Sequence, residues 1–276
     1  MESAIAKVGG IVRAHPLAAL AAGLLALVLA IVLLREGESE PRSMADPTAA
    51  GAALLSTLDA AIPLPDFSSP PEAKVRGPRF VIARVQAGES LELRTTPGGR
   101  VLKRLGDETE FGSPRAFWVG KIRGDWFGVV TTELPNGRLG WIRDDRTRLD
   151  VSETRYWLLA DRSDRMLGLY YGNRLLNRYP VSVGAPGTET PLGAFSITDA
   201  LAGPSVGPYY GCCILALSGH QPNLPSGWIG GDRMAIHGTP GAIGVAESAG
   251  CLRTTDETMV SLFARVPLGA PVYVRA

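Results

Sequence analysis

Residues 237–254 read HGTPGAIGVAESAGCLRT and contain the most informative pair of side chains in the sequence, His237 and Cys251. A thiol attacks a carbonyl carbon as the thiolate, and a nearby imidazole can take its proton at neutral pH. The two residues are 14 positions apart, so a hairpin-like reversal of the chain would bring them together. An isolated His/Cys pair is more often a buried structural cysteine and an unrelated histidine, so the flanking residues decide between the two interpretations.

The residues next to His237 predict a strand that ends where the imidazole emerges. The apolar run MAI, residues 234–236, leads into His237. Gly238 then allows the chain to turn, because glycine adopts turn conformations without steric cost. We expect the carbonyl of Gly238 to accept the Nδ1 proton and so to orient the imidazole.

The residues around Cys251 supply the other parts of an acyl-transfer site. Gly250 permits a tight turn immediately before Cys251, and backbone N–H groups at such a turn can point at a developing oxyanion. Arg253 carries a planar array of donors that suits a carboxylate. Ser248 can hydrogen-bond within the loop or to substrate. A nucleophile, a base, oxyanion donors and a carboxylate contact together indicate acyl transfer.

These motifs resemble a known catalytic domain. HGT, a glycine-containing spacer and SAGCLR are similar to the signature of the L,D-transpeptidase (YkuD-like) domain, and TPLGAF at residues 190–195 matches that family's TPxGxF segment. The resemblance covers residues 154–276. One position departs from it: the family often has SHGC, and here Ala249 replaces that second histidine. Catalysis is expected to survive the change, whereas turnover rate and substrate preference are open.

The resemblance implies roles for three residues and a reaction. Cys251 is the nucleophile, His237 its general base, and the Gly238 carbonyl the group that orients the imidazole. The thiolate attacks an L,D peptide bond in the tetrapeptide stem of a peptidoglycan donor, D-alanine leaves, and a thioester forms. An amine from an acceptor stem resolves the thioester into a 3→3 cross-link. We expect no metal and no cofactor.

Two alternatives remain at this point. Water could resolve the thioester instead of an amine, which would make the protein an L,D-carboxypeptidase on the same site. In the second alternative, the protein is not catalytic and binds the cell wall through its upstream domain. The presence of His237, Cys251 and Arg253 argues against the second alternative.

An apolar segment near the N-terminus predicts a membrane anchor. Residues 17–34, LAALAAGLLALVLAIVLL, contain no charge and are about long enough to cross a hydrocarbon core of roughly 30 Å as a helix. Lys7 and Arg13 precede the segment, which favours a cytoplasmic N-terminus at 1–16. We expect a single-pass anchor with the catalytic domain facing the cell wall; a cleaved signal peptide is the alternative. Residues 35–78 contain seven prolines and predict an extended tether.

The remaining sequence predicts a mainly β protein. Five short runs rich in Val, Ile, Thr and aromatic residues lie within 79–150, separated by turn residues at 97–99, 123–125 and 135–137. Five or six strands fit a small barrel, and these segments resemble bacterial SH3-like domains. We expect Trp118, Trp126 and Trp141 to belong to the barrel core rather than to a ligand platform.

The catalytic segment is also rich in strands and has one clear helix. Residues 254–265, TTDETMVSLFAR, predict that helix, with Thr255 as N-cap and acidic residues in the first turn. The final residues APVYVRA predict a closing strand. The stretch that contains His220 and Trp228 is either a flap over the site or an ordinary surface loop.

Charge and cysteine content exclude some classes of protein. The 276 residues carry a net charge of +1, with no concentrated basic segment, so no nucleic-acid partner is expected. Three cysteines do not form a disulfide framework. For Cys212 and Cys213 we expect burial in the strand CCILAL, in preference to a vicinal disulfide or a metal site with His220.

Overall fold

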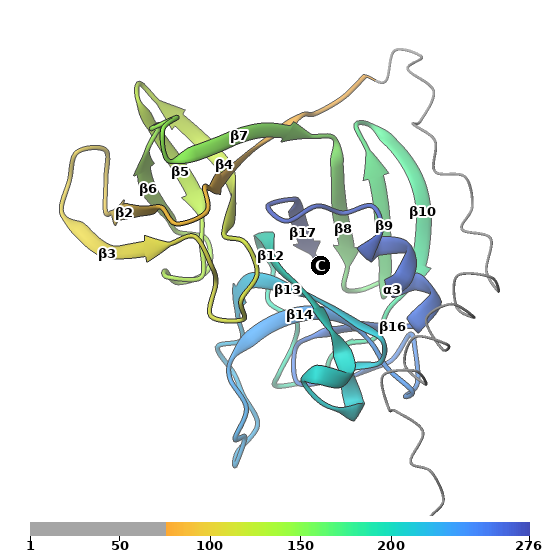
Figure 1. The fold of residues 1–276 in the computed structure, drawn as a ribbon. Helices are drawn as coiled ribbons and strands as arrows, with labels where there is room; N and C mark the ends of the chain where they lie inside the picture. The colour runs from red at the N-terminus through yellow and green to blue at the C-terminus, as the bar shows by residue number, and fades with distance from the viewer. Residues whose placement is uncertain (1–75) are drawn as a thin grey trace, which may run out of the picture. The chain divides into compact units, whose positions relative to one another are not determined.

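The computed structural model of the protein describes residues 76–276 (Figure 1). The predicted segments 1–16 and 17–34, and nearly all of the tether 35–78, lie outside these residues. Within the described part of the chain, no helix has the length and apolar character needed to cross a membrane.

The first sheet contains seven antiparallel strands in the order β3-β2-β6-β5-β4-β1-β7. The strands are β1 (Phe80–Val85), β2 (Ser90–Arg94), β3 (Val101–Gly106), β4 (Ala116–Arg123), β5 (Trp126–Val130), β6 (Leu139–Arg143) and β7 (Leu149–Thr154). Gly98, Gly124 and Gly137 have positive φ in the three predicted turns. The sequence did not indicate β3 and β7, the two edge strands, because at least half of the residues in each are exposed and neither strand has a clear apolar run.

Two of the three tryptophans in this sheet lie where expected. Trp118 and Trp141 are buried. Trp126 is only half-buried and lines a surface cavity with several arginines, so the prediction of a core position is wrong for this residue. Trp126 is the first residue of β5 and follows the turn at Gly124. It therefore lies at the end of the strand and not in its buried middle.

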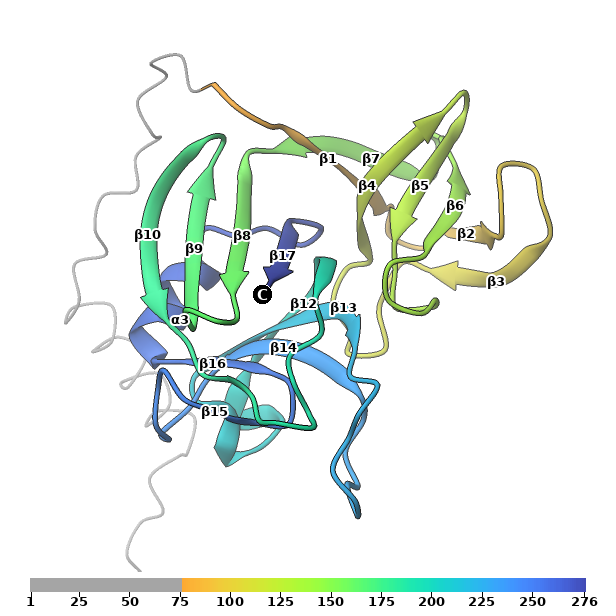
Figure 2. The same ribbon diagram turned by 180° about the vertical axis from the view of Figure 1, so that it is seen from behind.

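The second sheet contains eight strands in the order β10-β9-β8-β17-β12-β13-β14-β16 (Figures 1 and 2). Their bounds are β8 (Tyr156–Asp161), β9 (Met166–Tyr171), β10 (Arg174–Pro180), β12 (Gly193–Ala202), β13 (Cys213–His220), β14 (Arg233–Gly238), β16 (Leu252–Thr254) and β17 (Pro271–Arg275). The short strands β11 (Val183–Gly184) and β15 (Ala246–Ser248) form a separate parallel pair. Two 3-10 turns, η1 (Gly203–Ser205) and η2 (Pro208–Tyr210), connect β12 to β13. The expected closing strand is β17.

The predicted helix is α3 (Asp256–Phe263), and its cap is the one expected. The side chain of Thr255 accepts a hydrogen bond from the Thr258 N–H, and Asp256 and Glu257 occupy the first turn. Carboxylates there interact favourably with the helix dipole. Met259 and Leu262 are fully buried and join the apolar core of the second sheet, which includes Phe195. This helix begins two residues after β16, so its packing also holds the segment that carries Cys251 in place.

The prediction that Cys212 or Cys213 is buried as an ordinary strand residue is wrong. Both residues are half-buried, and a disulfide joins them. The reason is their position: β13 begins at Cys213, where the chain has just left η2 and has not yet entered the core. The amide of Cys212 donates to the Asp256 carboxylate at 2.9 Å, which ties this corner to the start of α3.

We expect Leu262→Ala to lower the free energy of unfolding by about 2–5 kcal/mol, because it leaves a cavity beneath the sheet. Val260→Ala is the matched control on the same helix: Val260 is 53% exposed and its truncation is expected to change stability by less than about 0.5 kcal/mol. Urea unfolding of both variants measures the difference. Equal destabilisation would contradict this packing of α3.

Candidate active site

The strands β14 and β16 bring the two predicted reactive residues together. His237 lies on β14, and Cys251 immediately precedes β16. The strands pair in parallel, with His237 opposite Arg253 and Ile236 opposite Leu252. The expected hairpin-like reversal is therefore wrong, since a hairpin pairs its strands antiparallel. Residues 239–251 instead form a crossover that passes through β15 and returns to the same edge of the sheet.

His237 is held with one nitrogen free. The side chain is 4% exposed, and its Nδ1–H donates to the Gly238 carbonyl at 2.7 Å. Its ring also meets the ring of Tyr210 edge-on, with centroids 4.9 Å apart. With the proton on Nδ1, Nε2 is left as the basic nitrogen.

Burial lowers the pKa of His237 to about 4; the Gly238 hydrogen bond raises this pKa and the charge of Arg253 lowers it further. Burial raises the pKa of the Cys251 thiol, whereas a backbone hydrogen bond from Ala235 and the charge of Arg253 lower it. At neutral pH the imidazole is therefore unprotonated and the thiol keeps its proton. The resting site is a neutral pair, and His237 has the capacity to accept a proton during attack.

Gly238 is needed for space rather than for a turn. It is the last residue of β14, and a Cβ there would lie 2.0 Å from Oδ1 of Asp256. The Cα of Gly211 is also close to that position. The expectation that the chain turns at Gly238 is thus wrong, but its carbonyl does orient His237.

The loop before Cys251 is fixed by hydrogen bonds. Ser248 is buried; its hydroxyl donates to the Cys251 carbonyl at 2.7 Å and accepts from the Gly250 N–H at 3.1 Å. Of the two predicted roles of Ser248, the structure supports the bond within the loop. Gly250 has φ +117°, as the predicted turn requires, and a Cβ there would meet Nε2 of Gln221 at 2.2 Å.

Two further side chains, Thr190 and Gln221, help to hold this loop. The sequence did not assign a role to either of them. The buried hydroxyl of Thr190 donates to the Gly250 carbonyl at 2.9 Å and accepts from the Gly184 N–H at 2.9 Å. The Gln221 amide donates to the carbonyls of Thr188 and Glu189. Thr190 begins the TPLGAF segment, which was the available signal; Gln221 and Tyr210 belong to no motif in the sequence.

A cleft of about 400 Å³ opens beside the pair. Its lining includes His237, Cys251, Arg253 and Ala249. Arg253 lines this cleft, and its side chain makes no hydrogen bond or ion pair with another side chain of residues 76–276. Three of the predicted site residues do not line the cleft: Gly238, Ser248 and Gly250. Their hydrogen bonds position His237 and the loop before Cys251.

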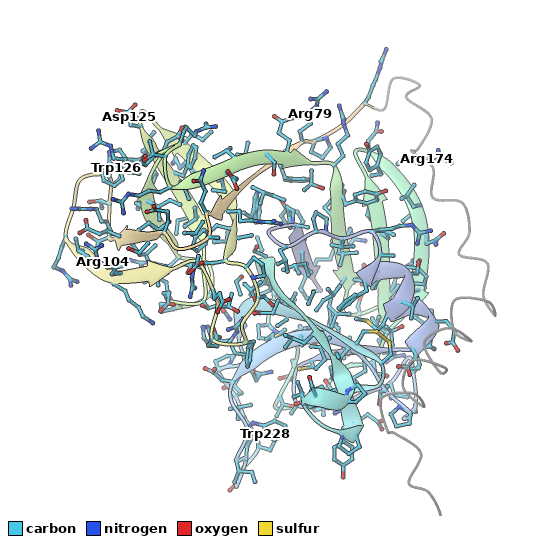
Figure 3. All side chains as sticks on the ribbon, viewed as in Figure 1. Arg79, Arg104, Asp125, Trp126, Arg174 and Trp228 are labelled. Atoms are coloured by element: carbon cyan, nitrogen blue, oxygen red, sulfur yellow. A yellow bond between two sulfur atoms is a disulfide. The ribbon has the colours of Figure 1, made fainter. Side chains whose placement is uncertain are left out.

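The stretch around His220 divides into two parts. Trp228 lines the cleft from a loop between β13 and β14 (Figure 3), as a flap residue would. His220 is directed elsewhere: its Nε2 contacts the Thr132 carbonyl at 2.8 Å, and its Nδ1 lies 3.0 Å from a carboxylate oxygen of Asp232. Among residues 76–276 no cluster of three or more His, Cys, Asp or Glu side chains is arranged to hold a metal ion.

Comparison with known proteins matches this segment to one family. The family model of the YkuD L,D-transpeptidase catalytic domain matches residues 155–274. Residues 155–274 are thus similar in sequence to the L,D-transpeptidase catalytic domain. Enzymes with this domain depend on a cysteine, and Cys251 is the one free cysteine of the described residues.

Two curated relatives carry the provisional description L,D-transpeptidase YkuD. The protein of Bacillus licheniformis is 34% identical over 121 residues, which are 43% of this chain and 65% of the relative. The protein of Bacillus subtilis is 32% identical over the same shares of the two chains. The chain thus spans less than two thirds of the length of these relatives. Among solved structures, an L,D-transpeptidase from Mycobacterium smegmatis is 18% identical, covers 50% of this chain and 73% of its own, and has a TM-score of 0.35.

The neutral pair in this catalytic domain predicts a specific pH profile for alkylation of Cys251. Because the thiol pKa is raised and that of His237 is about 4, thiolate is scarce at neutral pH and increases about tenfold per pH unit below the thiol pKa. The rate of reaction with iodoacetamide is therefore expected to rise steadily from pH 5 to 8. Cys251→Ser is the unlabelled control. A plateau across this range would indicate a thiolate–imidazolium pair instead.

Proposed function

We propose that this protein is an exported, membrane-anchored L,D-transpeptidase that forms 3→3 cross-links in peptidoglycan. The observation that carries the proposal is the pairing of β14 with β16, which places Cys251, the free nitrogen of His237 and the unpaired Arg253 around one cleft. The family match at residues 155–274 supports the same reaction.

In the first half-reaction, Nε2 of His237 takes the thiol proton as the sulfur of Cys251 attacks the carbonyl of the L,D peptide bond. The Gly250 amide already donates to Ser248, so we assign the oxyanion contact to the amide of Cys251. The bond to D-alanine then breaks, its nitrogen takes the proton from His237, and a thioester remains. Arg253 holds a carboxylate of the stem.

In the second half-reaction, the amine of an acceptor stem attacks the thioester. A carbon–nitrogen bond forms, the carbon–sulfur bond breaks, and His237 passes the amine's proton to the departing sulfur. This restores the neutral thiol and imidazole. Since Ala249 stands where the family often has a second histidine, one base serves both halves of the reaction.

The upstream parts of the chain give this reaction a location. We propose that residues 17–34 anchor the protein in the membrane and that the tether lets the catalytic domain reach the wall. The seven-stranded sheet is proposed to be an SH3-like module, supported by its short strands and glycine turns. Its contacts with the catalytic domain include the bond of the Asn136 amide to the His220 carbonyl at 2.7 Å.

Incubation of the purified protein with disaccharide tetrapeptide, followed by mass spectrometry, tests the reaction. Transpeptidation gives a cross-linked dimer and free D-alanine, whereas carboxypeptidase activity gives a shortened stem alone. We expect Cys251→Ala to lose both the dimer and the thioester adduct and to unfold at the wild-type urea concentration. Cross-linking by this variant, or an unaltered substrate with the wild type, would contradict the proposal.

The anchor is tested separately in cells. We expect the full-length chain to fractionate with membranes and to keep its first residues. A variant without residues 1–36 is expected in the soluble fraction, because it lacks the apolar segment. N-terminal sequencing of the mature protein provides the check, and a chain that begins after residue 34 would favour a cleaved signal peptide.

A further inference from the structure

We propose that Asn136 is a positioning residue for the nucleophile. It lies in the turn that joins β5 to β6 in the first sheet, and it acts through His220 and Gln221 on the loop that ends at Cys251. The inference adds a residue from outside the catalytic segment to the proposed function, on which its turnover measurement rests.

The side chain of Asn136 pairs with both backbone groups of one residue in the second sheet. Its amide donates to the His220 carbonyl at 2.7 Å, and its oxygen accepts from the His220 N–H at 2.9 Å. An asparagine amide suits this double contact, because it carries a donor and an acceptor side by side. The turn that presents Asn136 is itself fixed: the Arg138 N–H donates to the Pro135 carbonyl at 3.1 Å, and Gly137 has φ +79°.

Asn136 pairs with β13 at a point that the neighbouring strand β12 does not reach. The register pairing of β12 with β13 ends at Ile197, and Gly193–Ser196 pair with β17 instead. His220, the last residue of β13, therefore lies past the part of the strand that β12 covers. Since backbone N–H and C=O groups within a fold need partners, the Asn136 amide completes the sheet at this point. A second contact with the first sheet supports it, because Nε2 of His220 lies 2.8 Å from the Thr132 carbonyl.

The residue that follows His220 carries this restraint to the active site. Gln221 is 4% exposed, and its amide donates to two carbonyls of the segment before Thr190, at 3.0 and 3.1 Å. A Cβ added at Gly250 would lie 2.2 Å from Nε2 of Gln221, so this side chain packs directly against the residue before the nucleophile. The Thr190 hydroxyl donates to the carbonyl of the same glycine. Gln221 thus supports Gly250 both directly and through Thr190.

The position of Gly250 determines where the reacting atoms of Cys251 lie. The sulfur and the Cys251 amide, which we assign to the oxyanion, both follow Gly250 directly in the chain. A misplacement of about 1 Å at reacting atoms can cost about 100-fold in rate. Arg253 is held separately, by the register pairing of β16 with β14. Loss of the Asn136 side chain is therefore expected to slow the chemical step and to leave substrate binding nearly unchanged.

The first test compares Asn136→Ala with a control variant at the same junction. Glu110→Ala removes another contact between the two sheets, the ion pair of Glu110 with Arg233, and leaves the contacts of His220 and Gln221 in place. The measurement is kcat and KM for release of D-alanine from disaccharide tetrapeptide, with urea unfolding to show that each variant is folded. We expect Asn136→Ala to lower kcat about tenfold with KM within about twofold of the wild type, and Glu110→Ala to leave both constants within about twofold.

A double-mutant cycle tests whether Asn136 acts through Gln221. Gln221→Met keeps a side chain of similar length, removes the two hydrogen bonds to carbonyls, and is expected to lower kcat by itself. Adding Asn136→Ala is expected to lower kcat by less than about twofold more, because residues that act through one another are not additive. Should Asn136→Ala fail to fold, Asn136→Asp takes its place in both tests, since it keeps the acceptor for the His220 N–H and loses only the donor.

The reactivity of the Cys251 thiol provides a measurement that needs no substrate. A loosened loop exposes this thiol to water and reagent. We therefore expect Asn136→Ala and Gln221→Met to react with iodoacetamide at pH 7 about threefold faster than the wild type, and Glu110→Ala at the wild-type rate. Cys251→Ser is the unlabelled control.

The outcomes separate this inference from the proposed function. A wild-type kcat or a wild-type alkylation rate in the folded Asn136 variant would overturn the inference, as would an equal effect of Glu110→Ala or losses that multiply fully in the double variant. A rise in KM at constant kcat would also overturn it, because that pattern shows a role in substrate binding. If the wild type releases no D-alanine, the proposed function fails, and the alkylation rates alone then decide the inference.

Discussion

The parallel pairing of β14 with β16 is the constraint on which the catalytic site depends. It places His237 opposite Arg253 and holds Cys251 beside Ala235, although the sequence between them makes a wide crossover. Contacts from neighbouring segments of the chain stabilise this pairing. Ser248 and Thr190 hold the loop that enters β16, and the helix that follows is anchored in the core by buried apolar side chains.

Burial determines the electrostatics of the pair more than any single contact. It lowers the pKa of His237 and raises that of Cys251, so both groups are uncharged at rest. An uncharged pair avoids the cost of placing two ions in a largely desolvated site. The same burial makes Arg253 the main fixed charge near the sulfur. A carboxylate of the substrate would be drawn to that end of the cleft.

The sequence predicted a large part of the fold from local patterns. The helix with its Thr255 cap and the three glycine turns of the first sheet lie where expected, because caps and turns depend on residues that are adjacent in the chain. The edge strands β3 and β7 were missed, since an edge strand is defined by its neighbours in the sheet rather than by its own apolar pattern. The disulfide of Cys212 and Cys213 was also missed, because their burial depends on where β13 begins.

By itself the sequence determined which residue types carry the chemistry: a thiol, an imidazole and an arginine in short glycine-containing motifs whose spacing is local. Only the tertiary structure decided how they meet. The parallel register, the crowding that requires glycine at 238, and the contacts of Tyr210, Thr190 and Gln221 join segments that are far apart in the chain. The pKa shifts of His237 and Cys251 follow from that packing, because desolvation is a property of the assembled site.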